Sequence, residues 1–403
     1  MPKLKVALVH PRLGYGGSEA AVLWTLQALR EDYALTLISS GQVDLHRLNQ
    51  YYGTNLSDVD FLHRRVPIPA WLERSGKFAA LQGRFQLRYV RKVASEFDVV
   101  IGLYGPMDCG RPCIQRIADL SFVDEWRFFQ HPSVRDWNSW WYAAHSPVRK
   151  AYLGICDLVC SSEPERWKQN LTLSNSAWTQ TLMRQKFGVE STVGYAPVVG
   201  GFPPVPFSER ERGFVCIGRV SPEKRVDAMI EILSQVRARG HDTHLHILGG
   251  IDRSEYGTRV KNLAHRHRDW VFIEGWTLGE RKRALLTGHR YGIHARENEP
   301  FGIAVAEMIL AGCLVFVPDG GGQVEIVDHP ELVFENDADA VNKIDAILAS
   351  DAKQERVRAR LLEGSQRFSP ASFMGIIRSA LAEFLDKHWK QDNQPRTVAE
   401  NTA

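Results

Sequence analysis

The chain has 403 residues, of which 44% are hydrophobic and 24% charged, and its 50 Lys and Arg residues nearly balance 47 Asp and Glu residues. This length exceeds one ordinary compact core, so we expect two domains of ~150–200 residues each. The composition excludes a largely disordered chain, and the net charge of +3 gives no reason to expect a nucleic-acid partner.

Short apolar runs alternate with helical segments in the first half of the chain. Residues 5–9 are apolar and stop at a glycine-rich turn, residues 14–18, which precedes a segment of helical periodicity over residues 19–29. Further apolar runs at residues 35–38 and 98–103 predict two more strands. This alternation is typical of a parallel sheet that helices cover on both faces.

The glycine-rich turn contains Gly16 and Gly17 at the start of the first predicted helix. Free N–H groups and the helix dipole attract anions there, so phosphate binding is physically available. A dinucleotide site would also need an acidic residue at the end of the second strand, where residues 38–41 carry none. This disfavours a dehydrogenase, and a turn shaped only for packing stays open as a second interpretation.

Residues 62–95 carry eight basic side chains against one acidic residue, Glu73, with apolar residues such as Trp71 and Phe78 between them. This pattern is typical of a segment that lies on an anionic membrane. It is also typical of a solvated amphipathic helix packed on its own domain. Both interpretations stay open.

No apolar segment suited to a signal peptide follows Met1. The most apolar run, residues 302–318, is interrupted by Glu307 and is shorter than the ~20 residues that a membrane-spanning helix needs. We therefore expect a cytoplasmic protein, either free or peripheral on the inner face of a membrane.

The six cysteines are dispersed through the chain, so we expect free thiols. Cys113 stands four positions after Cys109, and Cys160 stands four positions after Cys156. On a helix this spacing would put both thiols of a pair on one face, where they could hold a metal ion. The spacing is weak evidence, and burial as small residues is the favoured interpretation.

A run rich in Pro and Gly at residues 195–213 ends the first half of the chain. The second half repeats the alternation, with predicted strands at residues 214–218, 243–248, 271–273, 291–294 and 314–317 and predicted helices at residues 226–239 and 278–286. Two doubly wound parallel sheets that face each other would bring the carboxyl ends of their strands to one shared cleft.

Two cations, Arg219 and Lys224, follow the first strand of the second half. Cations just beyond the carboxyl end of a strand can neutralise a diphosphate leaving group without a metal ion. Alone this is a moderate signal, because Arg and Lys in loops are usually solvated.

The most specific pattern spans residues 297–307, followed after the next strand by a glycine turn at residues 320–322. The turn around Pro300 holds Glu299, and Glu307 lies about a turn and a half into the helix that follows. Carboxylates that face the cleft can accept hydrogen bonds from ribose or sugar hydroxyls, and the glycine turn offers N–H groups to phosphate oxygens.

At these residues the chain resembles the family-4 retaining glycosyltransferases of GT-B architecture, over residues 5–375. The matching motifs are the E-x7-E of Glu299 and Glu307, the R-x4-K of Arg219 and Lys224, the glycine turn before Glu325, and the Gly-Gly-x-Glu of Gly16 to Glu19. Within the family, His10-Pro11 ahead of that last motif, His131-Pro132 and residues 292–294 look most similar to mannosyltransferases that extend lipid-linked oligosaccharides on the cytosolic face.

The resemblance implies the role of each residue. Glu299 would bind the transferred sugar and His131 would approach its reacting face, so both are expected to be catalytic; a turn histidine before Pro132 is the alternative for His131. The implied donor-binding residues are Gly16, Gly17, Arg219, Lys224, Trp276, Phe301, Gly302, Ile303, Glu307, Gly321 and Gly322. Of these, Arg219 and Lys224 would bind the diphosphate and Glu307 the ribose.

The implied fold is α/β of the GT-B type, with two Rossmann-like domains. The expected boundaries are an acceptor-binding domain at residues 1–197, a linker at 198–212, a nucleotide-sugar-binding domain at 213–375, and a helix and tail at 376–403. The implied activity transfers a hexose, with mannose favoured, from a GDP- or UDP-sugar to a glycan or lipid-linked acceptor with retention. A sugar-nucleotide epimerase or other GT-B enzyme and a non-catalytic binding subunit are the alternatives.

Sugar transfer that depends on a metal would use an Asp-x-Asp pair at the end of a strand. Residues 58–60 and 337–339 have this pattern, but the first pair lies between irregular segments and the second is expected to cap a helix that starts near Ala338. We therefore expect neither a metal ion nor another cofactor.

Overall fold

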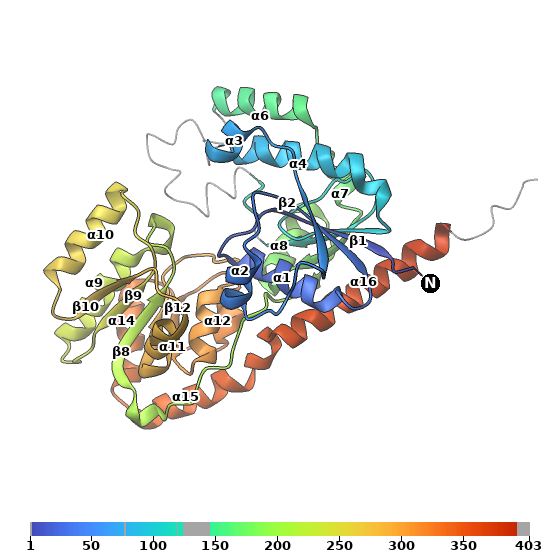
Figure 1. Ribbon diagram of the computed structural model, residues 1–403. Helices are drawn as coiled ribbons and strands as arrows, with labels where there is room; N and C mark the ends of the chain where they lie inside the picture. The colour runs from blue at the N-terminus through green and yellow to red at the C-terminus, as the bar shows by residue number, and fades with distance from the viewer. Residues whose placement is uncertain (1, 76–77, 119, 124–145, 393–403) are drawn as a thin grey trace, which may run out of the picture.

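The computed structural model describes residues 2–75, 78–118, 120–123 and 146–392 (Figure 1). They form two α/β domains, each built on a parallel sheet with helices on its faces. The predicted class, two doubly wound parallel-sheet domains, is confirmed.

The first domain contains a seven-stranded sheet. Its strands are β1 (Lys5–Arg12), β2 (Ala34–Ser40), β3 (Phe61–Arg65), β4 (Val99–Gly102), β5 (Ile114–Ile117), β6 (Leu171–Ser174) and β7 (Thr192–Val193). Its helices are α1 (Gly17–Leu29), α2 (Leu45–Tyr52), α3 (Ala70–Ser75), α4 (Ala79–Val93), α6 (Pro147–Val159), α7 (Pro164–Trp167) and α8 (Ala177–Phe187). The strands lie in the order β3-β2-β1-β4-β5-β6-β7, so the chain reverses its direction of winding between β1 and β4.

The apolar run of β1 explains its central place in this sheet. Val6 and Leu8 pack in the core that includes α1, whereas Ala7 and Val9 pack in the core that includes α4. A strand whose successive side chains are buried on both faces must lie between two layers of helices. The glycine turn at the carboxyl end of β1 thereby reaches the edge of the sheet where ligands bind in such folds.

The second domain contains a six-stranded sheet. Its strands are β8 (Glu211–Ile217), β9 (Leu245–Leu248), β10 (Val271–Gly275), β11 (His289–Ile293), β12 (Leu314–Pro318) and β13 (Val333–Phe334). Its helices are α9 (Val226–Ala238), α10 (Glu255–Arg266), α11 (Gly279–Gly288), α12 (Ile303–Leu310), α13 (Gln323–Val327), α14 (Asp337–Leu348) and α15 (Asp351–Glu363). The order β10-β9-β8-β11-β12-β13 again changes direction at the first strand, so β8 and β11 mark the ligand-binding edge.

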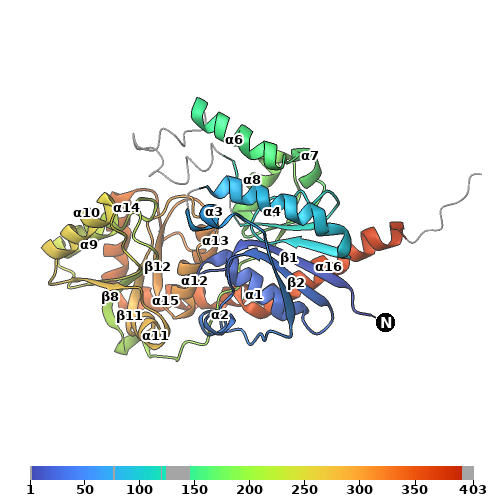
Figure 2. The same cartoon turned by 45° about the horizontal axis from the view of Figure 1, so that its top comes forward.

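The last described helix, α16 (Pro370–Asp392), runs from the second domain back to the first (Figures 1 and 2). Phe373, Ile377 and Leu381 are buried in the same core as α1. Arg378 Nε also donates to the carbonyl of Ala28 at 3.0 Å. The C-terminal helix therefore ties the two domains together.

The second Asp-x-Asp pair, residues 337–339, differs from expectation in its capping role. The helix predicted to start near Ala338 starts at Asp337, and its cap is Asn336, whose side chain accepts from the Asp339 N–H at 3.0 Å. Asp337 instead pairs with Arg225 at 3.0 Å. Asn and Asp are about equally favoured at a helix N-cap, so Asn336 and Asp337 are both suitable residues, one position apart.

The cysteine pairs also differ from a helical arrangement. Cys109 and Cys113 both lie in the loop between β4 and β5, not on a helix, whereas Cys156 lies on α6 and Cys160 caps its end. All six thiols are free, which confirms that prediction.

Candidate active site

The cations predicted to bind a diphosphate lie just beyond β8. Lys224 ends a short 3-10 helix, residues 222–224, that follows the strand. The side chain of Arg219 is 71% exposed and contacts Glu223 at 3.3 Å. Arg219 therefore carries a solvent-facing guanidinium at the carboxyl end of a strand that borders the point where the sheet changes direction.

Glu299 lies inside a cluster of three basic side chains. Its Oε2 is 2.6 Å from Lys224 Nζ and 3.4 Å from His294 Nε2, and its Oε1 is 3.2 Å from Arg296 Nη1. The side chain of Glu299 is only 11% exposed. Such a carboxylate can stay buried because its charge is paired several times.

The electrostatics of this cluster keep Glu299 ionised. Burial alone would raise the pKa of its carboxyl, but the charges of Lys224 and Arg296 outweigh burial and hold that pKa well below the usual value. Burial lowers the pKa of the neighbouring His294, so its imidazole is neutral near pH 7. The site offers a fixed anion beside two cations.

The glycine turn at residues 320–322 fixes the backbone of Glu299. Gly321 pairs with Glu299 in an isolated parallel bridge, and the Gly322 N–H donates to the Glu299 carbonyl at 2.8 Å. A Cβ on Gly321 would lie 2.5 Å from that carbonyl oxygen, and the φ of Gly321 is +85°. Glycine is required there for both reasons. The Gly322 N–H is thus engaged within the protein, and its predicted contact with phosphate stays a prediction.

Glu307, on α12, forms an ion pair with Lys282 of α11. Both of its carboxylate oxygens accept from Lys282 Nζ, at 2.8 and 2.9 Å. The ammonium of Lys282 also lies 6.0 Å from the ring centroid of Tyr51, which belongs to the first domain. Burial, with the charge of Glu307 as a smaller cause, raises the pKa of Tyr51 to about 12. Glu307 is therefore at the boundary between the domains.

The glycine turn after β1 lies against the same boundary. A Cβ on Gly17 would lie 2.6 Å from Ile303 Cδ1, so Gly17 allows the first turn of α1 to approach α12. The Gly16 N–H donates to the Tyr52 hydroxyl at 2.7 Å and is thus engaged within the protein. The structure brings Gly17, Ile303 and Glu307 into one region, although they are far apart in the sequence.

Trp276 follows β10 and is 57% exposed. Its ring centroid lies 6.0 Å from that of Tyr15, which in turn packs edge-on against Tyr51. These aromatic rings come from both domains and flank the region of Glu307.

Phe301 and Gly302 connect the Glu299 turn to α12. Phe301 is buried against Tyr195 and Phe368, so its side chain packs and only its backbone can face a ligand. Gly302 has a φ of +107°, a conformation that favours glycine just before a helix.

A carboxylate of the second domain caps a helix of the first. Glu325 accepts from the Ala177 N–H at 3.1 Å, from the Trp178 N–H at 3.2 Å and from the Tyr195 hydroxyl at 2.8 Å. An anion at the start of α8 is favoured by the free N–H groups and the helix dipole. Ser176 adds a hydrogen bond of 2.6 Å to the Pro300 carbonyl, next to Glu299.

His131 lies outside the described residues, so its predicted role is untested. Sequence reasoning missed Lys282, Arg296 and the helix-capping role of Glu325. Arg296 stands three residues before Glu299, which was an available signal. The pairing of Lys282 with Glu307 joins two helices, and because the residues are 25 positions apart, no short sequence motif indicates it.

Residues 202–361 match the family model described as Glycosyl transferases group 1. The matched region is the second domain, which holds Arg219, Lys224, Glu299 and Glu307. The second domain is thus similar to the group 1 glycosyltransferases, over less than half of the chain.

Curated relatives extend the likeness. A GDP-Man:Man(3)GlcNAc(2)-PP-Dol alpha-1,2-mannosyltransferase of Dictyostelium discoideum is 23% identical over 247 residues, 55% of this chain and 49% of that protein. The Mus musculus protein of the same description is 25% identical over 228 residues, 51% of this chain and 46% of that protein. The chain thus spans about half the length of the curated relatives that it matches.

Solved structures show the same fold over nearly the whole chain. A sucrose-phosphate synthase of Thermosynechococcus elongatus has a TM-score of 0.68 at 13% identity, covering 96% of this chain and 100% of that one. Anabaena Alr3699/HepE in complex with UDP and glucose has a TM-score of 0.66 at 14% identity, covering 94% and 100%. The predicted GT-B fold is confirmed.

Proposed function

We propose that this protein is a retaining, metal-independent glycosyltransferase of family 4 that transfers a hexose, with mannose favoured, from a nucleotide diphosphate sugar. The observation that carries the proposal is the ionised Glu299, whose carboxylate lies 2.6 Å from Lys224 Nζ. Arg219, five residues before Lys224, has an exposed side chain, and Glu307 lies at the domain boundary. The group 1 match over residues 202–361 and the described activity of the curated mannosyltransferases support it.

In this proposal the donor binds along the ligand-binding edge of the second sheet. Arg219 and Lys224 bind the two phosphates, Glu307 accepts from the ribose hydroxyls, and Trp276 flanks the base. Glu299 accepts from hydroxyls of the sugar. Lys282 holds Glu307 in place through its paired contacts of 2.8 and 2.9 Å.

The chemical step breaks the bond between the anomeric carbon and the β-phosphate oxygen. The hydroxyl oxygen of the acceptor forms a new bond on the same face of the sugar, and its proton goes to the leaving phosphate oxygen. Arg219 and Lys224 stabilise the charge that develops on that diphosphate, in the place that a metal ion takes in other transferases. In this proposal Glu299 faces the sugar as positive charge develops on its ring, and His131 keeps the catalytic role that the family resemblance implies.

The acceptor in this proposal is a glycan or a lipid-linked saccharide. The described substrates of the curated relatives support a lipid-linked acceptor. Such an acceptor requires the enzyme to work at a membrane surface, and within the described part of the chain no helix is long and apolar enough to span a bilayer. Because such an acceptor lies in a membrane, contact of the enzyme with the cytoplasmic face of that membrane is part of the proposal.

Helices α3, α4 and α6 supply a surface for that contact (Figure 2). Three apolar side chains on α3 and α6 are exposed: Trp71 (64%), Ile155 (57%) and Leu158 (87%). Arg84 on α4 pairs with Asp157 on α6 at 2.7 Å, so the helices lie side by side. Exposed apolar side chains beside basic ones are typical of interfacial helices.

Ion pairs reduce the charge that this surface can offer. Within the segment 62–95, the basic residues paired with carboxylates are Arg64, Arg65, Arg84 and Arg91. Arg74, Arg88 and Lys92 are exposed and make no ion pair with a described residue. We therefore propose that apolar insertion contributes to membrane contact as much as charge does.

The proposal is tested by giving the purified protein GDP-mannose and UDP-glucose separately in a thermal-shift assay. A donor at 100 times its Kd should stabilise the protein by ~2.7 kcal/mol. The stabilising donor is then incubated with a lipid diphosphate oligosaccharide, and the anomeric configuration of the product is determined by NMR. An inverted product, or donor epimerisation without acceptor, would refute retaining transfer.

A further inference from the structure

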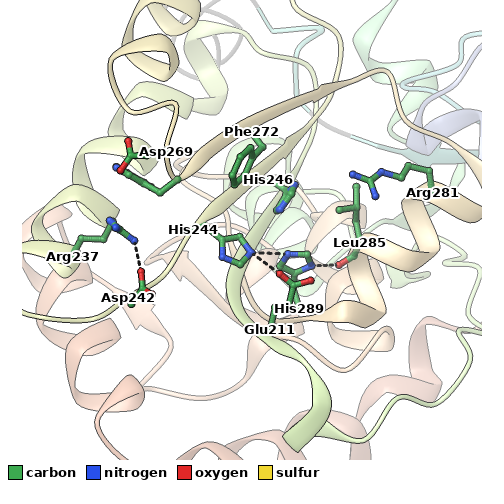
Figure 3. Close-up of a pocket in the computed structure, with 11 residues that line it drawn as sticks. Glu211, Arg237, Asp242, His244, His246, Asp269, Phe272, Arg281, Leu285 and His289 are labelled. Atoms are coloured by element: carbon green, nitrogen blue, oxygen red, sulfur yellow. Dashed lines mark hydrogen bonds and ion pairs between the residues drawn. The ribbon is translucent and has the colours of Figure 1, made fainter.

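Three histidines gather on the second sheet (Figure 3). They are His244, just before β9, His246 on β9, and His289 at the start of β11. One ring nitrogen of each lies within 4.8 Å of those of the other two. Because these residues lie toward the amino ends of their strands, they occupy the edge opposite to the Glu299 cluster.

The hydrogen bonds of two histidines leave the same nitrogen available. The Nδ1 of His289 lies 2.7 Å from the Leu285 carbonyl, and the Nδ1 of His246 lies 2.7 Å from Glu274 Oε1. A carbonyl and a carboxylate only accept, so in the neutral form of each ring Nδ1 carries the proton and Nε2 keeps a lone pair. Carbonyl and carboxylate partners of this kind orient histidines that bind metal ions.

The remaining histidine, His244, lies directly beside His289. His244 Nε2 lies 3.0 Å from His289 Nε2. The carboxylate of Glu211 adds an oxygen 3.4 Å from His244 Nε2, on a side chain that is 65% exposed. Three imidazoles and one carboxylate thus converge from β8, β9 and β11, with Phe272 stacked on His246 at a ring distance of 4.9 Å.

A glycine makes room for this arrangement. Gly213 lies on β8, the strand between β9 and β11, and a Cβ there would lie 2.2 Å from His244 Nε2. Any other residue would force the His244 ring away from His289. The cavity beside the rings has a volume of about 400 Å³ and connects them to solvent, so an ion has a path of entry.

We propose that His244, His246 and His289 bind one Zn²⁺ ion, with Glu211 or a water molecule as the fourth ligand. Three neutral imidazoles with an oxygen ligand suit Zn²⁺, which favours tetrahedral sites of nitrogen and oxygen donors.

The ion has a structural role, because it lies at the sheet edge opposite to Lys224 and Glu299. It ties β9 and β11 to α11, whose Leu285 carbonyl holds His289 and whose Arg281 pairs with Glu274 at 3.0 Å. The same helix carries Lys282, the partner of Glu307. Zinc should therefore stabilise the second domain and leave the sugar-transfer step without a metal.

The test uses the full chain without an affinity tag, freed of metal by chelation. Calorimetry with ZnCl2 should give one ion per chain with a Kd of about 1 µM or tighter, and the ion should raise Tm. His246→Asn and His289→Gln should each weaken binding by ~100-fold or more, and Glu274→Gln, which changes only an orienting partner, by ~10-fold.

Two further variants separate a built site from incidental binding. Gly213→Ala changes none of the ligand residues but displaces the His244 ring, so it should also weaken zinc binding. His265→Asn changes an exposed histidine on α10, so this variant should bind zinc as the parent does.

Co²⁺ in the parent should give the strong visible absorption of a four-coordinate site. Equal zinc affinity in the parent and His246→Asn, or less than one ion per chain, would overturn the proposal.

Discussion

The ammonium of Lys224 lies 2.6 Å from Glu299 Oε2, so a carboxylate predicted to face a sugar and a cation predicted to face a diphosphate are direct partners. Glu299→Gln keeps the shape but removes the charge. If Glu299 acts on the transition state, kcat should fall ~100-fold or more while donor affinity changes much less. His131→Ala should give the same pattern.

The control for this variant is Glu297→Gln. Glu297 stands two residues before Glu299 but is 63% exposed and pairs with Arg225. Its kinetics should match the parent. A Glu299→Gln enzyme that raises donor KM without a change in kcat would place Glu299 in recognition alone.

Glu307 and Lys282 should behave as a unit in donor binding. A ribose contact is made about equally in the ground state and the transition state, so Glu307→Ala should raise donor KM and leave kcat nearly unchanged. Lys282→Ala should raise KM less, and the double variant should show less than the sum of the two effects, because the residues are in contact. The measurement is a double-mutant cycle on KM, with the exposed neighbour Arg283→Ala as control.

Sequence motifs predict those parts of the site whose residues lie close together in the chain. Glu299 and its glycine partners were predicted because they belong to short motifs, at residues 297–307 and 320–322, whereas Arg296 was missed although it stands three residues before Glu299. The cap of α8 could not be predicted in this way, because Glu325 and Ala177 are 148 residues apart and meet only through the domain arrangement. The histidines are a similar case: His244 and His289 are 45 residues apart, and only the sheet order puts Gly213 between them.

Sugar transfer should survive chelation. Arg219 and Lys224 supply the charge that balances the diphosphate, so EDTA should leave kcat unchanged at a temperature well below unfolding. The same treatment should lower Tm if the histidine cluster holds zinc. Initial rates and Tm are measured on one chelated sample. Turnover that is lost in EDTA and restored by Mg²⁺ or Mn²⁺ would show that the transfer step needs a metal.

The surface of α3, α4 and α6 should bind anionic vesicles. The parent should co-sediment with phosphatidylserine vesicles more than with neutral ones, and the difference should shrink with added salt. Arg74→Ser with Arg88→Ser should reduce the salt-sensitive part, and Leu158→Ser the remainder. Arg356→Ser, exposed on the second domain, is the matched control for charge. Equal sedimentation with neutral vesicles, or none at low salt, would support a purely solvated surface.

The contact between Gly17 and Ile303 can decide between the two interpretations of the first glycine turn. In Gly17→Ala the new methyl would lie 2.6 Å from Ile303 Cδ1, the flexible end of a side chain that can move. If the turn serves packing alone, the cost appears in Tm, and Ile303→Val, which removes that Cδ1 atom, should restore it. If the space beside Gly17 instead accommodates a donor phosphate, the new methyl blocks the phosphate, and a change of Ile303 to Val does not restore binding.

We expect the second outcome, because Gly17 opens a helix whose N-terminus lies beside the α12 residues that include Glu307. Gly17→Ala should raise donor KM by about 10-fold, equivalent to ~1.4 kcal/mol, with a small change in Tm. The double variant Gly17→Ala with Ile303→Val should keep the raised KM, and Ile303→Val alone should resemble the parent. Recovery of the parent KM in the double variant would assign Gly17 to domain packing and remove it from the donor site.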